Sequence, residues 1–408
     1  MFSRRAFLSR SALIGCSLAA SPLVTPISFA ATPGENRLVV IILRGGMDGL
    51  DVVQPYGDPD FARLRGAPGV ADPDGPVDLD GFYALHPALR PLLPLWQQGQ
   101  LGFVQAVSTP YRDKRSHFDG QDLLEAGITD LSRGLSRDGW LNRLLQHVPG
   151  AGAETAYAIG RDSMAILNGP APVSGWSPDA DLALSPQAMR LAALVMKDDP
   201  LFETAMARAF ALADSDGDPV AIDGGTDEMM SMIESDRKAS RGAGAESRIA
   251  RFAAERLRAD TRIASFSING WDTHEAQARP LGRALARLSD TILALRDALG
   301  APVWGKTTVV AMTEFGRTVR LNGTRGTDHG TGGLMILAGG AVRGGRVFGD
   351  WPGLTEAALY QGRDLMPTRD VRAHAGWLLH GLFGLERSLV ERVVFPGVDL
   401  GADPGLLL

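Results

Sequence analysis

The sequence of 408 residues contains a single cysteine, Cys16, which lies near the N-terminus. The residues around Cys16 resemble a lipidation box, but Arg10 leaves only a short apolar core before the cysteine. If residues 1–30 are cleaved as an export signal, the mature chain has no thiol. A disulfide, a thiolate metal ligand and a cysteine nucleophile are then excluded, so zinc-finger and cysteine-hydrolase classes are not expected.

The chain also lacks a strong excess of either charge. Its 41 Lys and Arg residues against 47 Asp and Glu residues give a net charge of −6. A nucleic-acid partner would require a basic face, so none is expected. No apolar run after the N-terminal region approaches the ~20 residues that cross a bilayer, so the mature chain is expected to have no transmembrane segment.

The N-terminus resembles a twin-arginine export signal. Arg4 and Arg5 are followed by the weakly apolar residues 11–24 and by a small-residue site at residues 28–30. This pattern predicts a signal peptide over residues 1–30, with cleavage before Ala31. The twin-arginine export machinery is then a partner, and the mature protein is periplasmic or secreted.

The apolar pattern predicts one α/β domain over residues 31–408. Continuous β-branched and apolar runs fit strands of a parallel sheet covered on both faces. They alternate with helical stretches, which is typical of a doubly wound α/β fold. Predicted strands cover residues 37–43, 101–107, 155–159, 261–268, 307–312 and 334–338; predicted helices cover residues 91–98, 118–126, 247–259 and 277–300. An Ala-rich block at about residues 162–260 predicts a helical cap inserted on the sheet.

Acidic and histidine side chains follow the predicted strands closely. In open α/β sheets, ligands bind just beyond the carboxyl ends of the strands. Carboxylate oxygens and imidazole nitrogens are the ligands that divalent metal ions find in proteins. The chain therefore predicts metal ligands at this edge, namely Asp48, Asp272, His274, Glu314, Asp328 and His329.

Several motifs in a fixed order carry a family resemblance. They read GGMDGLD, RSHFDGQD, GWDTH, TEFGRT and GTDHGTGG, within roughly residues 37–385. Together they resemble the domain of unknown function family 1501 and, more broadly, the alkaline phosphatase-like (sulfatase-like) superfamily. The superfamily resemblance implies an alkaline phosphatase-like fold and one or two divalent ions (zinc, manganese or calcium) that act on a phosphate or sulfate ester. The family itself has no settled reaction.

The same resemblance divides the ligands between two sites. It assigns Asp272, His274 and His329 to the principal site, and Asp48, Glu314 and Ser116 to a second site. Here the chain departs from the superfamily, because Phe315 follows Glu314 where a histidine is expected.

One imidazole of the second site is therefore missing, and His117 is the candidate replacement. Asp328 is expected to orient the neighbouring His329 or to coordinate beside it, because carboxylates next to metal-binding imidazoles fix their tautomers.

The sequence allows two roles each for the candidate nucleophile, Ser116, and for the candidate anion-binding residues, Arg44 and Arg317. Ser116 precedes a predicted helix, whose N-terminus would favour negative charge on an attacking oxygen. It is equally a helix N-cap, with Asp119 three residues on. Arg44 and Arg317 each follow a strand end and could bind a substrate oxyanion or form a salt bridge with a nearby carboxylate.

We therefore expect an exported metal-dependent hydrolase of a small anionic ester. The alternative is a non-catalytic periplasmic binding or assembly protein that retains the fold and one ion. The missing imidazole at Phe315 favours this alternative.

Overall fold

The computed structural model describes residues 34–67, 69–130, 138–160, 164–177 and 244–408. The fold below is that of the compact unit within residues 32–408. The predicted export signal and most of the predicted cap lie outside the described residues. The cap helices are therefore an expectation that the structure does not address.

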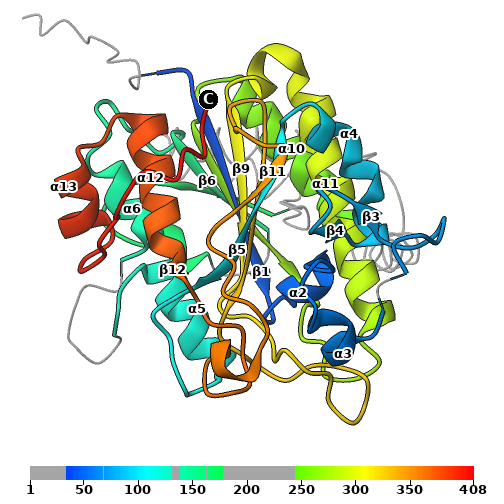
Figure 1. The fold of residues 1–408 in the computed structure, drawn as a ribbon. Coiled ribbons are helices and arrows are strands. Elements are labelled where there is room, and N and C mark those ends of the chain that lie inside the picture. Colours follow the sequence, from blue (N-terminus) through cyan, green and yellow to red (C-terminus); the bar gives the residue numbers. More distant parts are fainter. Residues whose placement is uncertain (1–33, 68, 131–137, 161–163, 178–243) are drawn as a thin grey trace, which may run out of the picture. The chain divides into compact units, whose positions relative to one another are not determined.

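A mainly parallel sheet lies at the centre of the described unit (Figure 1). The strand order is β11-β5-β10-β9-β1-β8-β6-β7, and β12 pairs with β5. All six predicted strands are confirmed within about two residues, but β10 runs antiparallel to both of its neighbours. The strands are β1 (Arg37–Arg44), β5 (Leu101–Ser108), β6 (Ala156–Ile159), β7 (Ser174–Trp176), β8 (Ile263–Asn269), β9 (Thr307–Met312), β10 (Gly333–Ala338), β11 (Arg346–Phe348) and β12 (Arg369–Asp370).

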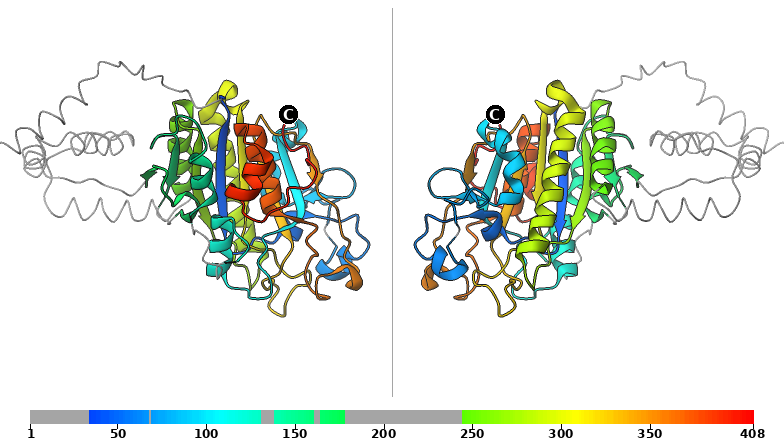
Figure 2. Two further views of the ribbon diagram at one scale, coloured as in Figure 1. Left: turned by 90° about the vertical axis from the view of Figure 1, so that its left-hand side faces the viewer. Right: turned by 90° about the vertical axis from the view of Figure 1, so that its right-hand side faces the viewer.

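Strand β1 shows why its sequence is apolar throughout. Val39 and Ile41 face one hydrophobic cluster, whereas Val40 and Ile42 face another on the opposite side of the sheet. Helices α4 (Leu93–Gln97), α10 (Ala245–Arg258) and α11 (Ala278–Trp304) cover the first face, and α6 (Trp140–Leu145) and α12 (Val371–Phe383) cover the second (Figure 2). Burying each aliphatic side chain contributes about 2 kcal/mol to folding stability, so β1 contributes strongly to the stability of the fold.

The helices differ from prediction in two places. Helix α10, which the sequence placed in the cap, packs against α11 through Ala250, Ala253 and Leu257 in the layer on the sheet. The predicted helix at residues 91–98 is confirmed over α4 (Leu93–Gln97), but residues 91 and 92 belong to a preceding 3-10 helix, η1 (Pro87–Leu92). Other elements are α2 (Gly49–Val52), α3 (Phe61–Arg65), α5 (His117–Ala126), η2 (Ala165–Leu167), η4 (Glu356–Ala358), α13 (Arg387–Leu389), η5 (Val390–Val394) and a small antiparallel sheet of β2 (Val53–Gln54), β4 (Ala84–Leu85) and β3 (Val77–Asp78).

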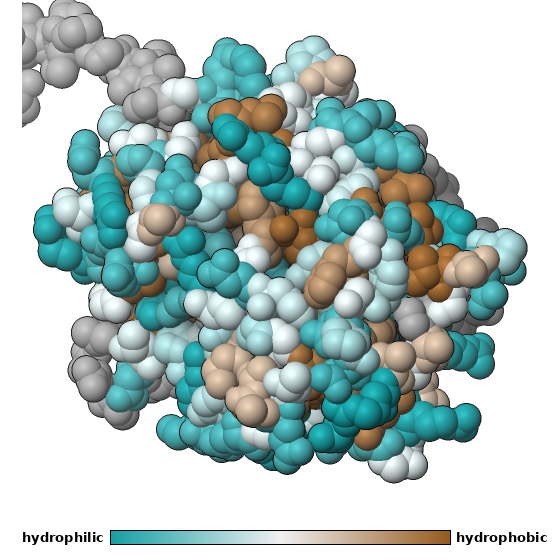
Figure 3. Space-filling view, in the orientation of Figure 1, coloured by the Kyte–Doolittle hydropathy of each residue, from teal (hydrophilic) through white to brown (hydrophobic). Residues whose placement is uncertain are grey.

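The surface of the described unit is largely polar. In the space-filling view, hydrophilic residues cover much of the face shown, and apolar residues form small separate areas (Figure 3). No helix in the described part of the chain is long and apolar enough to cross a membrane.

One buried histidine makes stability depend on pH. Burial lowers the pKa of His374 to about 3, and the charge of Arg369 acts in the same direction. Neither ring nitrogen of His374 has a hydrogen-bond partner among the described residues. Because the folded-state pKa is depressed, the contribution of the neutral ring is complete above an unfolded pKa of about 6.5 and is lost as the pH falls toward 3.

We therefore expect His374→Leu to weaken the loss of stability in acid. Between pH 6 and 4 the wild type should lose about 1.4 kcal/mol per pH unit more than the variant, since one proton binds only to the unfolded chain. Urea unfolding at pH 7, 6, 5 and 4 measures both slopes. Equal slopes in the two proteins would contradict the assignment.

Candidate metal centre

The predicted ligands meet at one edge of the sheet. Strands β1, β8 and β9 are parallel and end at this edge, and the antiparallel β10 begins there. Asp272 and His274 follow β8, Glu314 follows β9, His329 precedes β10, and α5 begins at His117. Residues far apart in the sequence therefore come together, as the strand-end argument predicts.

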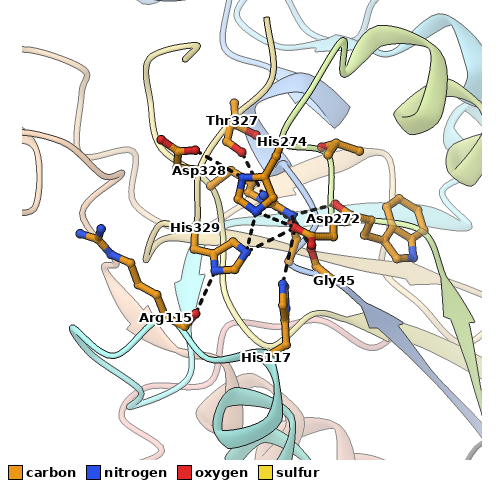
Figure 4. Close-up of polar contacts among 12 residues, drawn as sticks. Gly45, Arg115, His117, Asp272, His274, Thr327, Asp328 and His329 are labelled. Atoms are coloured by element: carbon orange, nitrogen blue, oxygen red, sulfur yellow. Dashed lines mark hydrogen bonds and ion pairs between the residues drawn. The ribbon is translucent and has the colours of Figure 1, made fainter. Parts of the chain in front are cut away.

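Three imidazole rings converge on one carboxylate oxygen (Figure 4). The Asp272 Oδ1 atom lies 3.0 Å from His274 Nε2, 3.3 Å from His329 Nε2 and 3.5 Å from His117 Nε2. The Nε2 atoms of His274 and His329 are 3.0 Å apart. Four candidate ligand atoms thus crowd into one small space.

The opposite nitrogen of two of these rings faces an acceptor. His329 Nδ1 lies 2.9 Å from the main-chain carbonyl of Arg115, and His274 Nδ1 lies 3.3 Å from Asp328 Oδ1. Hydrogen bonds from Asn322 and His274 hold the pKa of Asp328 below its usual value, so its carboxylate is ionised. A proton on each Nδ1 would be donated to its acceptor, which would leave the Nε2 of each ring as the atom able to bind an ion.

The third ring is fixed in the same way by a buried acid. His117 Nδ1 lies 2.7 Å from Glu314 Oε1, which also accepts from the Gly45 amide at 2.9 Å and from Gln121 at 3.1 Å. Burial alone would raise the pKa of Glu314, but these hydrogen bonds outweigh it and lower the pKa. The hydrogen bond with Glu314 raises the pKa of His117. His117 Nε2 is buried, has no hydrogen-bond partner among the described residues and faces Asp272 Oδ1.

This arrangement could hold a metal ion. A cation or a proton between the imidazole nitrogens and the anionic Asp272 oxygen would stabilise this arrangement. In a tetrahedral site with metal–ligand bonds of about 2.05 Å, ligand atoms lie about 3.3 Å apart. The three separations from Asp272 Oδ1 and the one between His274 and His329 are 3.0–3.5 Å, close to that value. His117, Asp272 and His329 could hold an ion, since their ligand atoms all lie within 4.8 Å of one another. His274 lies beside this set, with its Nε2 3.0 Å from Asp272 Oδ1.

Asp328 and Glu314 occupy different positions from those predicted. Asp328 contacts His274 rather than its chain neighbour His329, because the loop turns the two side chains apart. Glu314 holds the far nitrogen of His117, so it supports a ligand instead of facing the centre. Carboxylates in this position orient imidazoles and strengthen metal binding.

Arg317 lies behind Asp272. It is buried, its Nη2 donates to Asp272 Oδ1 at 2.6 Å, and its other donors reach the carbonyls of Gly45, Gly46 and Thr327. Burial alone would raise the pKa of Asp272, but Arg317 and the imidazoles lower it. Of the two roles left open for Arg317, the salt bridge with a carboxylate matches the contacts, because its guanidinium is occupied by Asp272 and by main-chain oxygens.

Asp48 is balanced by a cation that the sequence did not suggest. Arg65 donates to its two oxygens at 2.7 and 3.1 Å, and Gln277 donates at 2.7 Å. The side chains of Arg65 and Asp48 are 2% and 1% exposed. Asp48 and Glu314 therefore have separate partners, which argues against the predicted second metal site.

Arg44 is also engaged with a carboxylate. Its Nη2 lies 2.8 Å from Glu125 Oε1, and its Nη1 donates to Gln121 at 2.8 Å. Burial raises the pKa of Glu125 although Arg44 acts against this shift. Of the two predicted roles for Arg44, the salt bridge matches the contacts.

Ser116 is the N-cap of α5. Its hydroxyl accepts from the Asp119 amide at 3.4 Å, and its own amide donates to the Tyr111 hydroxyl at 2.7 Å. The cap hydrogen bond is long, and it uses the serine oxygen only as an acceptor. Capping therefore leaves the hydroxyl proton of Ser116 available.

A buried glutamine that sequence reasoning missed joins the ligand loops. Gln277 donates to Asp48 and to Asp51, at 2.7 and 2.8 Å, and accepts from the hydroxyls of Thr273 and Thr327 at 2.8 and 2.6 Å. Thr273 lies between two candidate ligands, so this amide ties their loop to two others. Its position at a predicted helix start gave no signal of this role.

The comparisons with known proteins give a family and one distant structure. The family model described as "Protein of unknown function (DUF1501)" matches residues 105–375. No curated protein matches the chain. A crystal structure described as Ps i-CgsB in complex with k-i-k-neocarrahexaose is similar at a TM-score of 0.36 and 10% identity, over 87% of this chain and 73% of that one. A likeness at this level gives no information on the reaction of this chain.

Proposed function

The chain belongs to the DUF1501 family, whose description assigns no reaction, and we propose that it is a metal-dependent hydrolase of phosphate or sulfate esters. The observation that carries this proposal is the convergence of three imidazole Nε2 atoms on Asp272 Oδ1. Ligands at the ends of several strands of a mainly parallel sheet also support the alkaline phosphatase-like superfamily as the wider relationship.

The proposed centre holds one ion. Its ligands are His117, Asp272, His274 and His329, and a set rich in imidazole favours zinc or manganese over calcium, which prefers oxygen ligands. A second ion has little support, since Arg65 already compensates the charge of Asp48. When bound, the ion would polarise the ester oxygen and stabilise negative charge in transfer.

The chain's own groups would position the reactants. The side chains of Asp272 and His274 are 46% and 41% exposed, so one side of the centre is open to a substrate. We propose Ser116 as the nucleophile, because the N-terminus of α5 favours the negative charge that develops on its oxygen. Arg317 and Glu314 would hold Asp272 and His117 in place.

One observation favours the non-catalytic alternative. Four protein ligands are the number found in closed structural zinc sites, whereas catalytic sites keep a position open. The exposure of Asp272 leaves room for a further ligand, which is why we prefer the hydrolase.

Turnover of simple esters separates the two functions. The protein loaded with zinc or manganese is expected to hydrolyse 4-nitrophenyl phosphate or 4-nitrophenyl sulfate, to lose this activity with a chelator, and to regain it when metal is restored. Release of 4-nitrophenolate measures the rate. A protein that retains its ion but turns over neither ester would be the binding protein instead.

We further propose that the protein acts outside the cytoplasm. The support is the arginine pair with its apolar and small-residue segments in residues 1–30. Changing Arg4 and Arg5 to lysine is expected to retain the protein in the cytoplasm with its signal uncleaved, because lysine lacks the planar guanidinium. Cell fractionation with mass spectrometry of the N-terminus measures this; normal export of the double variant would contradict it.

A further inference from the structure

Two exposed apolar residues neighbour residues of the candidate centre in the chain. Phe118, Leu321 and Leu408 are the large apolar side chains exposed in the described part of the chain, at 84%, 41% and 80%. Phe118 directly follows His117, and Leu321 precedes Asn322, whose amide donates to the carbonyl of His274.

The third exposed side chain lies elsewhere. The amide of Leu408 donates to the carbonyl of Ala341, which follows the far end of β10 (Figure 1). Exposed apolar surface is unfavourable in water, and Phe118 is the exposed apolar residue that directly follows a candidate ligand in the chain.

Phe118 is held on a rigid element. The first turn of α5 is tied to the sheet by the 2.7 Å contact of His117 with Glu314. The His117 ring also stacks on Phe315, with centroids 5.0 Å apart. A Cβ at Gly120 would lie only 3.1 Å from the Phe315 ring, so the helix packs closely against it. The ring of Phe118 is therefore presented from a fixed backbone, which lowers the entropy cost of binding.

Positive charge lies in the same turn of chain. Lys114 and Arg115 are exposed, and the carbonyl of Arg115 accepts from His329. In Figure 4 the Arg115 side chain extends outward from the centre, where an approaching anion would meet it. Cations at the rim and an aromatic ring beside the metal ligands suit a molecule that carries both an anionic group and an apolar ring face.

We propose that Phe118 binds the alcohol portion of the substrate and that this portion contains a ring. The inference rests on the proposed function: the anionic group of the ester lies at the metal centre, and the ring packs on Phe118. The substrate class is therefore a phosphate or sulfate ester of a ring-bearing alcohol. Phe118 sets specificity and is neither a metal ligand nor a nucleophile.

Non-hydrolysable probes test this without any need for turnover. Phenylphosphonate and methylphosphonate form one pair, and benzenesulfonate and methanesulfonate form the other. Calorimetry on the protein incubated with zinc or manganese measures the four affinities, and metal analysis of the same sample is recorded separately. The two pairs distinguish a phosphate-type from a sulfate-type anion.

We expect the phenyl probe of at least one pair to bind about tenfold more tightly than its methyl partner in the wild type. In Phe118→Ala the ratio should fall to about one while the metal content is unchanged, and Leu408→Ala should retain the wild-type ratio. A wild type without ring preference, or a preference that survives in Phe118→Ala, overturns the inference. If the wild type prefers the phenyl probe but hydrolyses no ester, the ring-binding role of Phe118 is supported and only the proposed hydrolase activity is contradicted.

Discussion

Replacing His117 with alanine is expected to remove the bound ion and to abolish ester hydrolysis. The change deletes one of the three Nε2 atoms that surround Asp272 Oδ1. It also leaves Glu314, which is 0% exposed, without its imidazole partner, at a cost of about 3 kcal/mol of folding stability. Metal analysis gives the stoichiometry. Thermal unfolding with and without zinc gives the stabilisation that an ion provides when only the folded state binds it.

Two further variants make this prediction specific. His147→Ala removes an exposed histidine that is not a candidate ligand and should retain the ion. Glu314→Gln keeps an acceptor for His117 Nδ1 but removes the charge, so it should weaken metal binding by about 10- to 100-fold. A His117→Ala protein that folds and holds one ion at wild-type affinity would show that His117 is not a ligand.

Replacing Ser116 with alanine or asparagine is expected to abolish turnover while the ion stays bound. Both changes remove the hydroxyl, but asparagine caps a helix about as well as serine does. Ser116→Ala should therefore lose about 1 kcal/mol of stability, and Ser116→Asn should lose little. Initial rates with 4-nitrophenyl esters, urea unfolding and metal analysis measure the three properties.

The pair of variants separates a nucleophile from a cap. If Ser116 only caps α5, Ser116→Asn would hydrolyse esters at the wild-type rate. If it is the nucleophile, both variants would fall by several orders of magnitude, because a nucleophile contributes to the transition state far more than to stability. Wild-type turnover in Ser116→Asn would contradict the nucleophile assignment and leave water as the attacking group.

The sequence predicts the sheet and the neighbourhood of the centre well, for a physical reason. A strand buried on both faces must be apolar throughout, as residues 37–43 are, so it is visible without an alignment. Parallel strands then bring their carboxyl ends to one edge, which gathers Asp272 and Glu314 near His329. The location of the candidate centre was therefore predicted mainly from the positions of the strands, which the structure confirms.

The partners of each side chain could not be predicted in the same way. Whether Asp48 meets a metal ion or a guanidinium depends on the path of the chain between residues 53 and 65, which brings Arg65 back to it. The hydrogen bond between His329 and the main-chain carbonyl of residue 115 could not be predicted from the sequence, because every residue type at that position has the same carbonyl oxygen. His117 was a candidate only as a substitute ligand, and its contact with Asp272 gives it a central position.

The metal content of the purified protein tests the central claim most directly. The chain is purified, incubated separately with zinc and manganese, freed of excess ion, and measured by inductively coupled plasma mass spectrometry. We expect one tightly bound ion per chain, and none in a variant in which His117, His274 and His329 are all replaced by alanine. A wild-type chain that retains neither zinc nor manganese would contradict the metal centre and with it the proposed hydrolase.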